Sequence, residues 1–189
     1  MKILLFIFSL FSCMINAYVA FGQSQRPIKH NHPSGKMNVV SIGANLPMGN
    51  FSSTHIVGIV SEYAWSNHRF GQMDVKPVKP FGFIANAGIA YYFGKKETVS
   101  GYSYDYPGYD FLYIHGGVIY NPWKKGNINL TAGPALGIYN GNTQFNISSK
   151  LEGSYYFREK IGISPAIIVM KEHHADALWA ASLKATMAF

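Results

Sequence analysis

Two acidic and two basic residues are the best candidates in this chain for a group of side chains that interact with one another. Glu62, Lys150, Glu152 and Lys184 stand in alternating stretches that otherwise carry no acidic or basic residue except histidine. If those stretches are strands of one barrel, all four side chains face its interior, where an unpaired charge is expensive. They are therefore expected to pair, either as a packed polar plug that stabilises the fold or as the lining of a narrow pore or a salt-bridge switch. An eight-stranded barrel is just wide enough for side chains to fill, which favours the plug.

Three uncharged polar residues are expected on the same interior faces, namely Asn86, Tyr113 and His115. A lone histidine in a barrel lumen is more often a hydrogen-bonded filler than a catalyst. Acyl-transfer chemistry needs a serine, a histidine and an acid arranged together. The nearest approach is Ser53-Thr54-His55, which is generic. The sequence offers no convincing serine–histidine pair, so we predict no catalytic residue.

Metal binding is conceivable at His173-His174, which Glu172 and Asp176 flank, because imidazole and carboxylate are suitable ligands. A short loop cluster without a spaced partner elsewhere is more typical of a solvated loop. The histidines at positions 30 and 32 are interpreted in the same way. We predict neither a metal site nor a cofactor.

A tyrosine-rich segment, Gly101–Asp110, is the most distinctive feature outside the periodic stretches. Tyrosine combines a rigid contact surface with a polar tip, which suits recognition of another molecule. Anchoring beside a membrane explains the same composition equally well. The candidate recognition residues are Tyr102, Tyr104, Tyr106 and Tyr109.

The elements that must position these residues begin after an export segment. Residues 1–22 open with a lysine, continue with an apolar run and end in small residues, which predicts a signal peptide cleaved near Gly22. Residues 23–36 are polar, contain two prolines and predict a flexible linker. The remaining residues, 37–189, predict one barrel domain.

Eight stretches with a period of two follow, separated by turn residues. The expected strands are Val39–Leu46, His55–Trp65, Phe81–Phe93, Phe111–Tyr120, Asn127–Ile138, Phe145–Phe157, Ile161–Met170 and Trp179–Phe189. Short turns at one end and longer loops at the other are typical of an outer-membrane barrel. Asn67–Pro80 departs from this plan, because it is long yet falls on the short-turn side. Pro134 and Pro165 would face lipid, and each predicts a bulge or a local break.

The alternation fits either a soluble barrel with an apolar interior or a membrane barrel with an apolar exterior. Apolar residues make up 48% of the chain and charged residues 13%, whereas soluble domains carry about 25% charged residues. The apolar faces carry no charge, and aromatic residues gather near strand ends, as in interfacial girdles. These features predict an all-β, eight-stranded antiparallel up-and-down transmembrane β-barrel. Removal of the predicted signal peptide, with Lys2, reduces the net charge of +7 to 7 − 1 = +6, which suits an acidic lipid surface, and nothing in the chain suggests nucleic-acid binding.

The last strand ends in alternating hydrophobic residues and a terminal aromatic, through Met187 and Phe189. With the segment Gly43–Phe51, it resembles the small OmpA/OmpX-like outer-membrane β-barrel family over residues 37–189. In that family the C-terminal strand is the signal read by the barrel-assembly machinery. Lys184 stands where glycine is usual.

The resemblance implies a bacterial outer-membrane location, contact with outer-membrane lipid and lipopolysaccharide, assembly by the barrel-assembly machinery, and a monomer. Our prediction is a non-enzymatic barrel, structural or adhesin-like, that presents surface loops to an unidentified extracellular ligand and has a lumen filled by polar side chains. The alternatives are a narrow pore, a soluble lipocalin-like carrier and a lipid A-modifying enzyme.

Overall fold

The computed structural model describes residues 37–67, 80–123, 125–158, 160–172 and 176–189. The predicted signal peptide and linker, most of the Asn67–Pro80 connection and the His173-His174 pair lie outside these residues. The elements are β1 (Met37–Met48), α2 (Phe51–Thr54), β2 (His55–Ser66), β3 (Phe81–Gly94), β4 (Lys96–Val99), β5 (Tyr102–Asp105), β6 (Tyr109–Trp123), β7 (Gly126–Tyr139), β8 (Asn142–Tyr156), β9 (Ile161–Glu172) and β10 (Ala177–Ala188).

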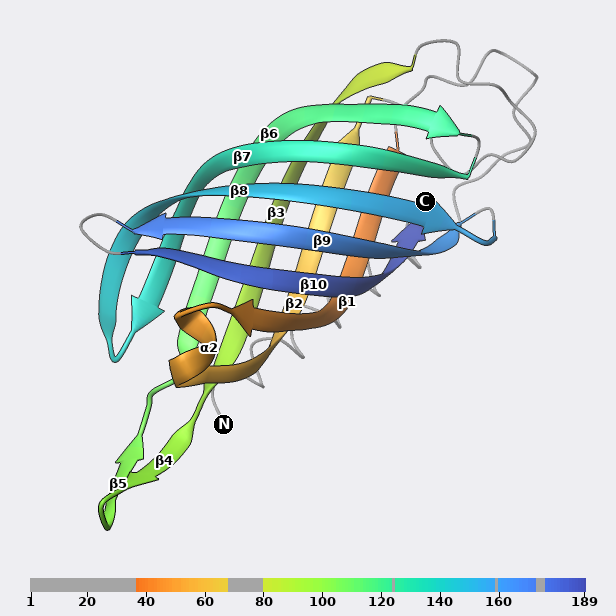
Figure 1. Cartoon of the computed structure of the whole chain (residues 1–189). Helices are drawn as coiled ribbons and strands as arrows, with labels where there is room; N and C mark the ends of the chain where they lie inside the picture. The colour runs from red at the N-terminus through yellow and green to blue at the C-terminus, as the bar shows by residue number, and fades with distance from the viewer. Residues whose placement is uncertain (1–36, 68–79, 124, 159, 173–175) are drawn as a thin grey trace, which may run out of the picture. The chain divides into compact units, whose positions relative to one another are not determined.

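Eight of these strands form a closed antiparallel barrel in the order β1-β10-β9-β8-β7-β6-β3-β2 (Figure 1). Barrel strands that are consecutive in the sequence are neighbours in the wall. Strand β10 closes the wall against β1, with Val40 opposite Met187. The predicted fold class is therefore confirmed, and the eight expected strands differ from the observed ones by at most three residues at each end. No helix among the described residues is long and apolar enough to cross a membrane.

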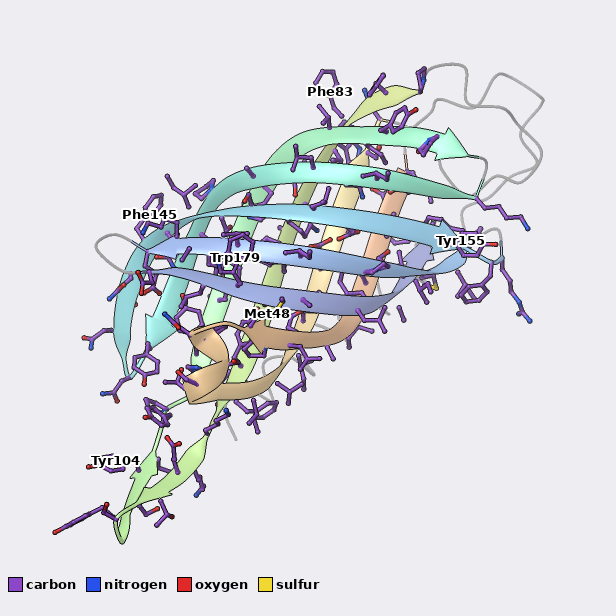
Figure 2. The ribbon with its side chains drawn as sticks, in the orientation of Figure 1. Met48, Phe83, Tyr104, Phe145, Tyr155 and Trp179 are labelled. Carbon is purple, nitrogen blue, oxygen red and sulfur yellow. The ribbon has the colours of Figure 1, made fainter. Side chains whose placement is uncertain are left out.

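The alternation of side chains decides which face of each strand points inward. On β3, Phe83 is 67% exposed, whereas Asn86 is 3% exposed. Figure 2 shows Phe83, Phe145 and Trp179 projecting away from the barrel wall. Because side chains of a strand alternate between its two faces, a single register places all of these apolar residues outside.

The two outward prolines interrupt hydrogen bonding without shifting the register, so the expectation of a bulge is wrong and that of a local break is right. Pro134 pairs with Ile147 of β8, but the pairing between β6 and β7 has a gap at positions 133 and 134. Pro165 pairs with Leu183, and the pairing between β8 and β9 has the corresponding gap at positions 164 and 165. A proline lacks one donor, so only one of its two ladders is interrupted.

The ends of the barrel differ in their connections. At one end, which we call the turn end, β1 begins and β10 ends. The turns from β6 to β7 and from β8 to β9 lie at the same end. At the opposite end, which we call the loop end, β1 leads into α2, and β3 leads into the two-stranded β4–β5 hairpin (Figure 1). Strands β7 and β8 are joined there by only Asn140 and Gly141, both at positive φ, as a tight two-residue hairpin turn requires. The predicted contrast between short turns and long loops is therefore incomplete.

Candidate functional site

The four charged residues of the predicted interior meet at one level of the barrel. Lys150 Nζ lies 2.5 Å from Glu62 Oε2 and 2.9 Å from Glu152 Oε2. Lys184 Nζ lies 3.0 Å from Glu62 Oε1 and 2.5 Å from Glu152 Oε2. Each lysine thus contacts both carboxylates, and each carboxylate contacts both lysines. We call these four residues, from β2, β8 and β10, the charge quartet.

Burial makes the charge quartet costly to break. The lysine side chains are 1% exposed, and the Glu62 and Glu152 side chains are 2% and 7% exposed. Tyr113 of β6 donates its hydroxyl to Glu62 Oε2 at 2.5 Å, so Glu62 accepts three hydrogen bonds. Equal numbers of opposite charges in mutual contact offset the loss of hydration, whereas removing one member would leave an uncompensated buried charge.

Two apolar clusters flank the charge quartet along the barrel axis. On β2 the inward residues are Val60, then Glu62, then Ala64. Val60 belongs to a buried apolar cluster toward the loop end, and Ala64 belongs to a second cluster toward the turn end. The second cluster comprises Met37, Val39, Ala64, Ile84, Ile119, Tyr156 and Ala188. The charge quartet therefore lies between two apolar clusters, in an interior that also buries serine, threonine and asparagine side chains on both sides of it.

The polar residues predicted beside the charge quartet are all buried, and their contacts differ. His115 Nε2 lies 2.5 Å from Ser148 Oγ, and His115 Nδ1 lies 3.4 Å from Thr131 Oγ1. The sequence offers no convincing serine–histidine pair, but the fold brings His115 of β6 and Ser148 of β8 into contact, which sequence spacing cannot relate. The ring nitrogen that a catalytic acid would contact faces a threonine instead, and both residues are 1% exposed. The Asn86 amide has no hydrogen-bond partner among the described residues.

An aromatic cluster fills the lumen at the loop end, and sequence reasoning missed it. Phe51, on the single turn of α2, is 3% exposed, and its ring lies 4.8 Å from Tyr92 and 5.7 Å from Tyr109 between centroids. His55 packs 4.7 Å from the same ring. Asn45 donates to the Tyr92 hydroxyl at 3.0 Å. The helix thus seats one phenylalanine in the mouth of the barrel, and we call these aromatic residues, Phe51, His55, Tyr92 and Tyr109, the mouth cluster.

The four tyrosines predicted for recognition separate into two groups. Tyr102 and Tyr104 lie on β5 and are 73% and 57% exposed, and Figure 2 shows Tyr104 on the hairpin, away from the barrel. Tyr106 is half-buried. Tyr109 is only 3% exposed, so its assignment to the surface is wrong. It is the first residue of β6 and points inward, where its hydroxyl donates to Glu172 Oε1 at 2.8 Å and accepts from Asn146 at 3.1 Å.

The outward face of the last strand carries the residues expected to form the assembly signal. Met187 is 41% and Phe189 45% exposed, in line with Leu183 and Trp179 on the same face. Phe189 and Asn38 exchange two backbone hydrogen bonds, at 2.9 and 3.2 Å, so the strand is paired to its end. Elsewhere, the described residues contain no group of three or more potential metal ligands.

Together, the closed wall, the apolar exterior and the charged interior define a class: the barrel is of the small outer-membrane type. No protein-family model matches the chain, and no curated protein matches it. Among solved structures, the chain is similar to the crystal structure of Ail, the attachment invasion locus protein of Yersinia pestis, with a TM-score of 0.52 and 10% identity over 81% of this chain and 98% of Ail.

Two further structures of Ail give the same result. The structure in a phospholipid bilayer nanodisc, where Ail is described as an outer membrane protein, matches with a TM-score of 0.54 and 10% identity over 81% of this chain and 99% of Ail. The complex with the heparin analogue sucrose octasulfate matches with a TM-score of 0.53 and 9% identity over 82% of this chain and 99% of Ail. At this identity the likeness shows the fold, and the predicted resemblance to OmpA/OmpX-like barrels is confirmed at that level.

Proposed function

We propose that this protein is a non-enzymatic outer-membrane β-barrel, a structural or adhesin-like scaffold with a closed interior that presents the β4–β5 hairpin outside the cell. The observation that carries the proposal is the reversed placement of residue types. Leu46, Ile114 and Phe145 are each more than 60% exposed, whereas the charge quartet is buried. A soluble carrier would place these groups the other way round.

A lipid environment accounts for the exterior. Large exposed apolar side chains occur on all eight barrel strands, whereas soluble monomers rarely expose a contiguous apolar patch larger than a few hundred Å². Aromatic residues lie near both ends of this band, as interfacial girdles do. The exposed aromatic side chains toward the turn end are Tyr63, Trp65, Phe81, Phe83, Tyr120, Tyr155, Phe157 and Phe189.

The interior argues for a plug rather than a pore. A conducting path would have to pass the buried side chains packed at each side of the charge quartet, an apolar cluster among them on either side, and then separate four ion pairs. Eight strands leave a lumen that side chains fill. The wall is also closed, so the barrel has no unpaired edge through which a second copy could add strands, which supports a monomer.

The hairpin supports a display role. Tyr102 and Tyr104 are exposed on a short sheet that extends beyond the barrel wall. A protein with this fold is described as an attachment invasion locus protein, and another of its structures holds a heparin analogue. The described loop end of the present chain carries five acidic and three basic side chains, namely Glu97, Asp105, Asp110, Glu172, Asp176, Lys95, Lys96 and Lys171. A net negative loop end does not favour a polyanionic ligand, so we expect an uncharged or basic surface to be recognised.

Fractionation of the producing cells tests the proposal. The protein should remain in outer membranes washed with urea, start after residue 22 by mass spectrometry, and change gel mobility on heating. Lys150 and Lys184 should resist a water-soluble amine reagent, whereas the exposed Lys96 should react. A protein recovered from the soluble periplasm contradicts the proposal, and single-channel conductance in planar bilayers would replace the scaffold with a pore. Unchanged lipid A after deletion of the gene is the expected result.

A further inference from the structure

The charged side chains that reach solvent are divided unequally between the two ends of the barrel. At the turn end, the described residues carry three basic side chains, Lys125, Arg158 and Lys160, and no acidic side chain. The loop end carries a net charge of −2 among its described side chains. Outside the described residues, Lys124 and Glu159 carry opposite charges by sequence, and residues 68–79 add Arg69, Asp74, Lys76 and Lys79.

The three basic residues lie on neighbouring parts of the wall. The Lys125 carbonyl accepts a hydrogen bond from Tyr156 N at 2.7 Å, which brings the turn between β6 and β7 against the end of β8. Arg158 and Ile161 exchange two backbone hydrogen bonds, at 3.2 and 3.3 Å, and form the turn between β8 and β9. The Lys160 carbonyl accepts from Ala188 N at 2.8 Å. The backbone therefore holds the three residues on one arc, formed by β7 to β10.

An aromatic pair lies directly beside this arc. Tyr155 is 47% and Phe157 49% exposed, on the outward face of the wall. Figure 2 shows Tyr155 projecting outward near this end of the barrel. Aromatic side chains at the end of an apolar band mark the boundary between hydrocarbon and headgroups. Arg158 and Lys160, one and three residues beyond Phe157, therefore lie at the depth of the headgroup phosphates.

We propose that this basic arc binds the anionic headgroups of glycerophospholipids in the leaflet facing the periplasm. The inference rests on the proposed outer-membrane location and adds the lipid class, the leaflet and the residues. Guanidinium and ammonium groups both bind phosphate, and arginine can do so through two parallel hydrogen bonds. The opposite end, which faces lipopolysaccharide, has a net negative charge in its described part. The net positive charge of the described turn end is thus placed for phospholipid on the inner side.

The test compares two charge-matched double variants of the full chain. Arg158→Gln/Lys160→Gln removes two charges from the basic arc, and Lys96→Gln/Lys171→Gln removes two from the loop end. Each is reconstituted in nanodiscs of equal parts phosphatidylglycerol and phosphatidylcholine, and native mass spectrometry measures the ratio of the two lipids retained. About fivefold is expected per basic residue near an anionic surface. The arc variant should lose about tenfold or more of its preference for phosphatidylglycerol, and the loop-end variant should keep it.

Each other outcome overturns the proposal in a recognisable way. An unchanged lipid ratio in the arc variant shows that the arc does not select lipid. Equal losses in both variants show a general effect of net charge. If detergent-solubilised protein binds soluble polyphosphate as tightly as it binds phosphatidylglycerol, the arc is a site for polyanions rather than for lipid. Heat-modifiable mobility in phosphatidylcholine vesicles is recorded for every variant, so that insertion of the barrel, on which the proposed function depends, is scored separately.

Discussion

The charge quartet and the mouth cluster close the same lumen by different interactions. The charge quartet joins β2, β8 and β10 through four ion pairs of 2.5 to 3.0 Å. The mouth cluster joins α2, β2, β3 and β6 through ring contacts around Phe51. The energy of the first depends on every member being present, because each charge is compensated by the others. The energy of the second depends on filled volume and declines gradually as atoms are removed.

The largest expected effect comes from removing one acid of the charge quartet. Glu62→Gln leaves Lys150 and Lys184 sharing Glu152, and should lower the free energy of unfolding by about 3–5 kcal/mol. Guanidinium titration of the full chain refolded in lipid vesicles, followed by gel mobility, measures this loss. Glu97→Gln on the exposed hairpin is the matched control and should change nothing measurable. Equal stability of the two variants would show that the charges are not coupled as the distances indicate.

Replacement of all four charges by apolar residues of similar size sharpens the same point. Buried ion pairs replaced together by well-packed apolar residues are often neutral or stabilising. The free energy of unfolding of the fourfold variant should therefore lie closer to that of the wild type than the free energy of unfolding of Glu62→Gln does. A fourfold variant less stable than the single one would mean that the charge quartet contributes net stability.

The mouth cluster should respond less sharply. Phe51→Ala removes a side chain that is 3% exposed, and core phenylalanine truncations cost about 3–5 kcal/mol. Because the mouth adjoins water that can refill the space, we expect about 2–3 kcal/mol in the same titration. Ser53→Ala, on the same helical turn, should stay within about 0.5 kcal/mol. A Phe51→Ala variant as stable as Ser53→Ala would show that α2 does not close the barrel.

Tyr113 links the two regions, since its ring lies in the apolar cluster and its hydroxyl donates to Glu62. Tyr113→Phe keeps the ring and removes one hydrogen bond to a charged group, which costs about 1.5–3 kcal/mol. We expect about 2 kcal/mol in the wild type and a smaller loss in a Glu62→Gln background. Identical losses in the two backgrounds would place Tyr113 outside the charge quartet.

The sequence predicts the wall well and the interior only in part. Alternation assigns each strand a face, so the inward position of Glu62, Asn86 and Lys184 follows from period two alone. Ring contacts across the lumen depend on the shear and closure of the barrel, which no local pattern encodes. For this reason the Ser148–His115 contact was not predicted. The sequence pattern places Tyr109 in the loop, because the predicted strand begins at Phe111, two residues after the observed start of β6.

The role of Phe51 depends equally on three-dimensional context. Its neighbours Asn50, Ser52 and Ser53 are polar, and a four-residue helix has no periodicity to read. Ser52 and Ser53 each donate a side-chain hydrogen bond back to the backbone, at 2.7 and 2.6 Å. The turn itself is held by the backbone bonds from Ser52 N to Gly49 O and from Ser53 N to Asn50 O, at 3.1 and 3.2 Å, and it places Phe51 inward. A lone aromatic residue between a strand and a polar turn could indicate such a plug in other barrels.

The smallest expected effect contrasts the charge quartet with an ion pair on the surface. Lys96 and Asp105 lie 2.9 Å apart on the hairpin, but their side chains are 79% and 64% exposed. Exposed pairs contribute about 0–1 kcal/mol, and salt screens them. Lys96→Gln should therefore change the free energy of unfolding by about 0.5 kcal/mol at most, and by nothing measurable in 1 M sodium chloride. The loss of free energy of unfolding caused by Glu62→Gln should be the same with and without 1 M sodium chloride, because water and ions do not reach the charge quartet. If salt removed that loss too, the charge quartet would have to be open to solvent, and the lumen would be a pore rather than a plug.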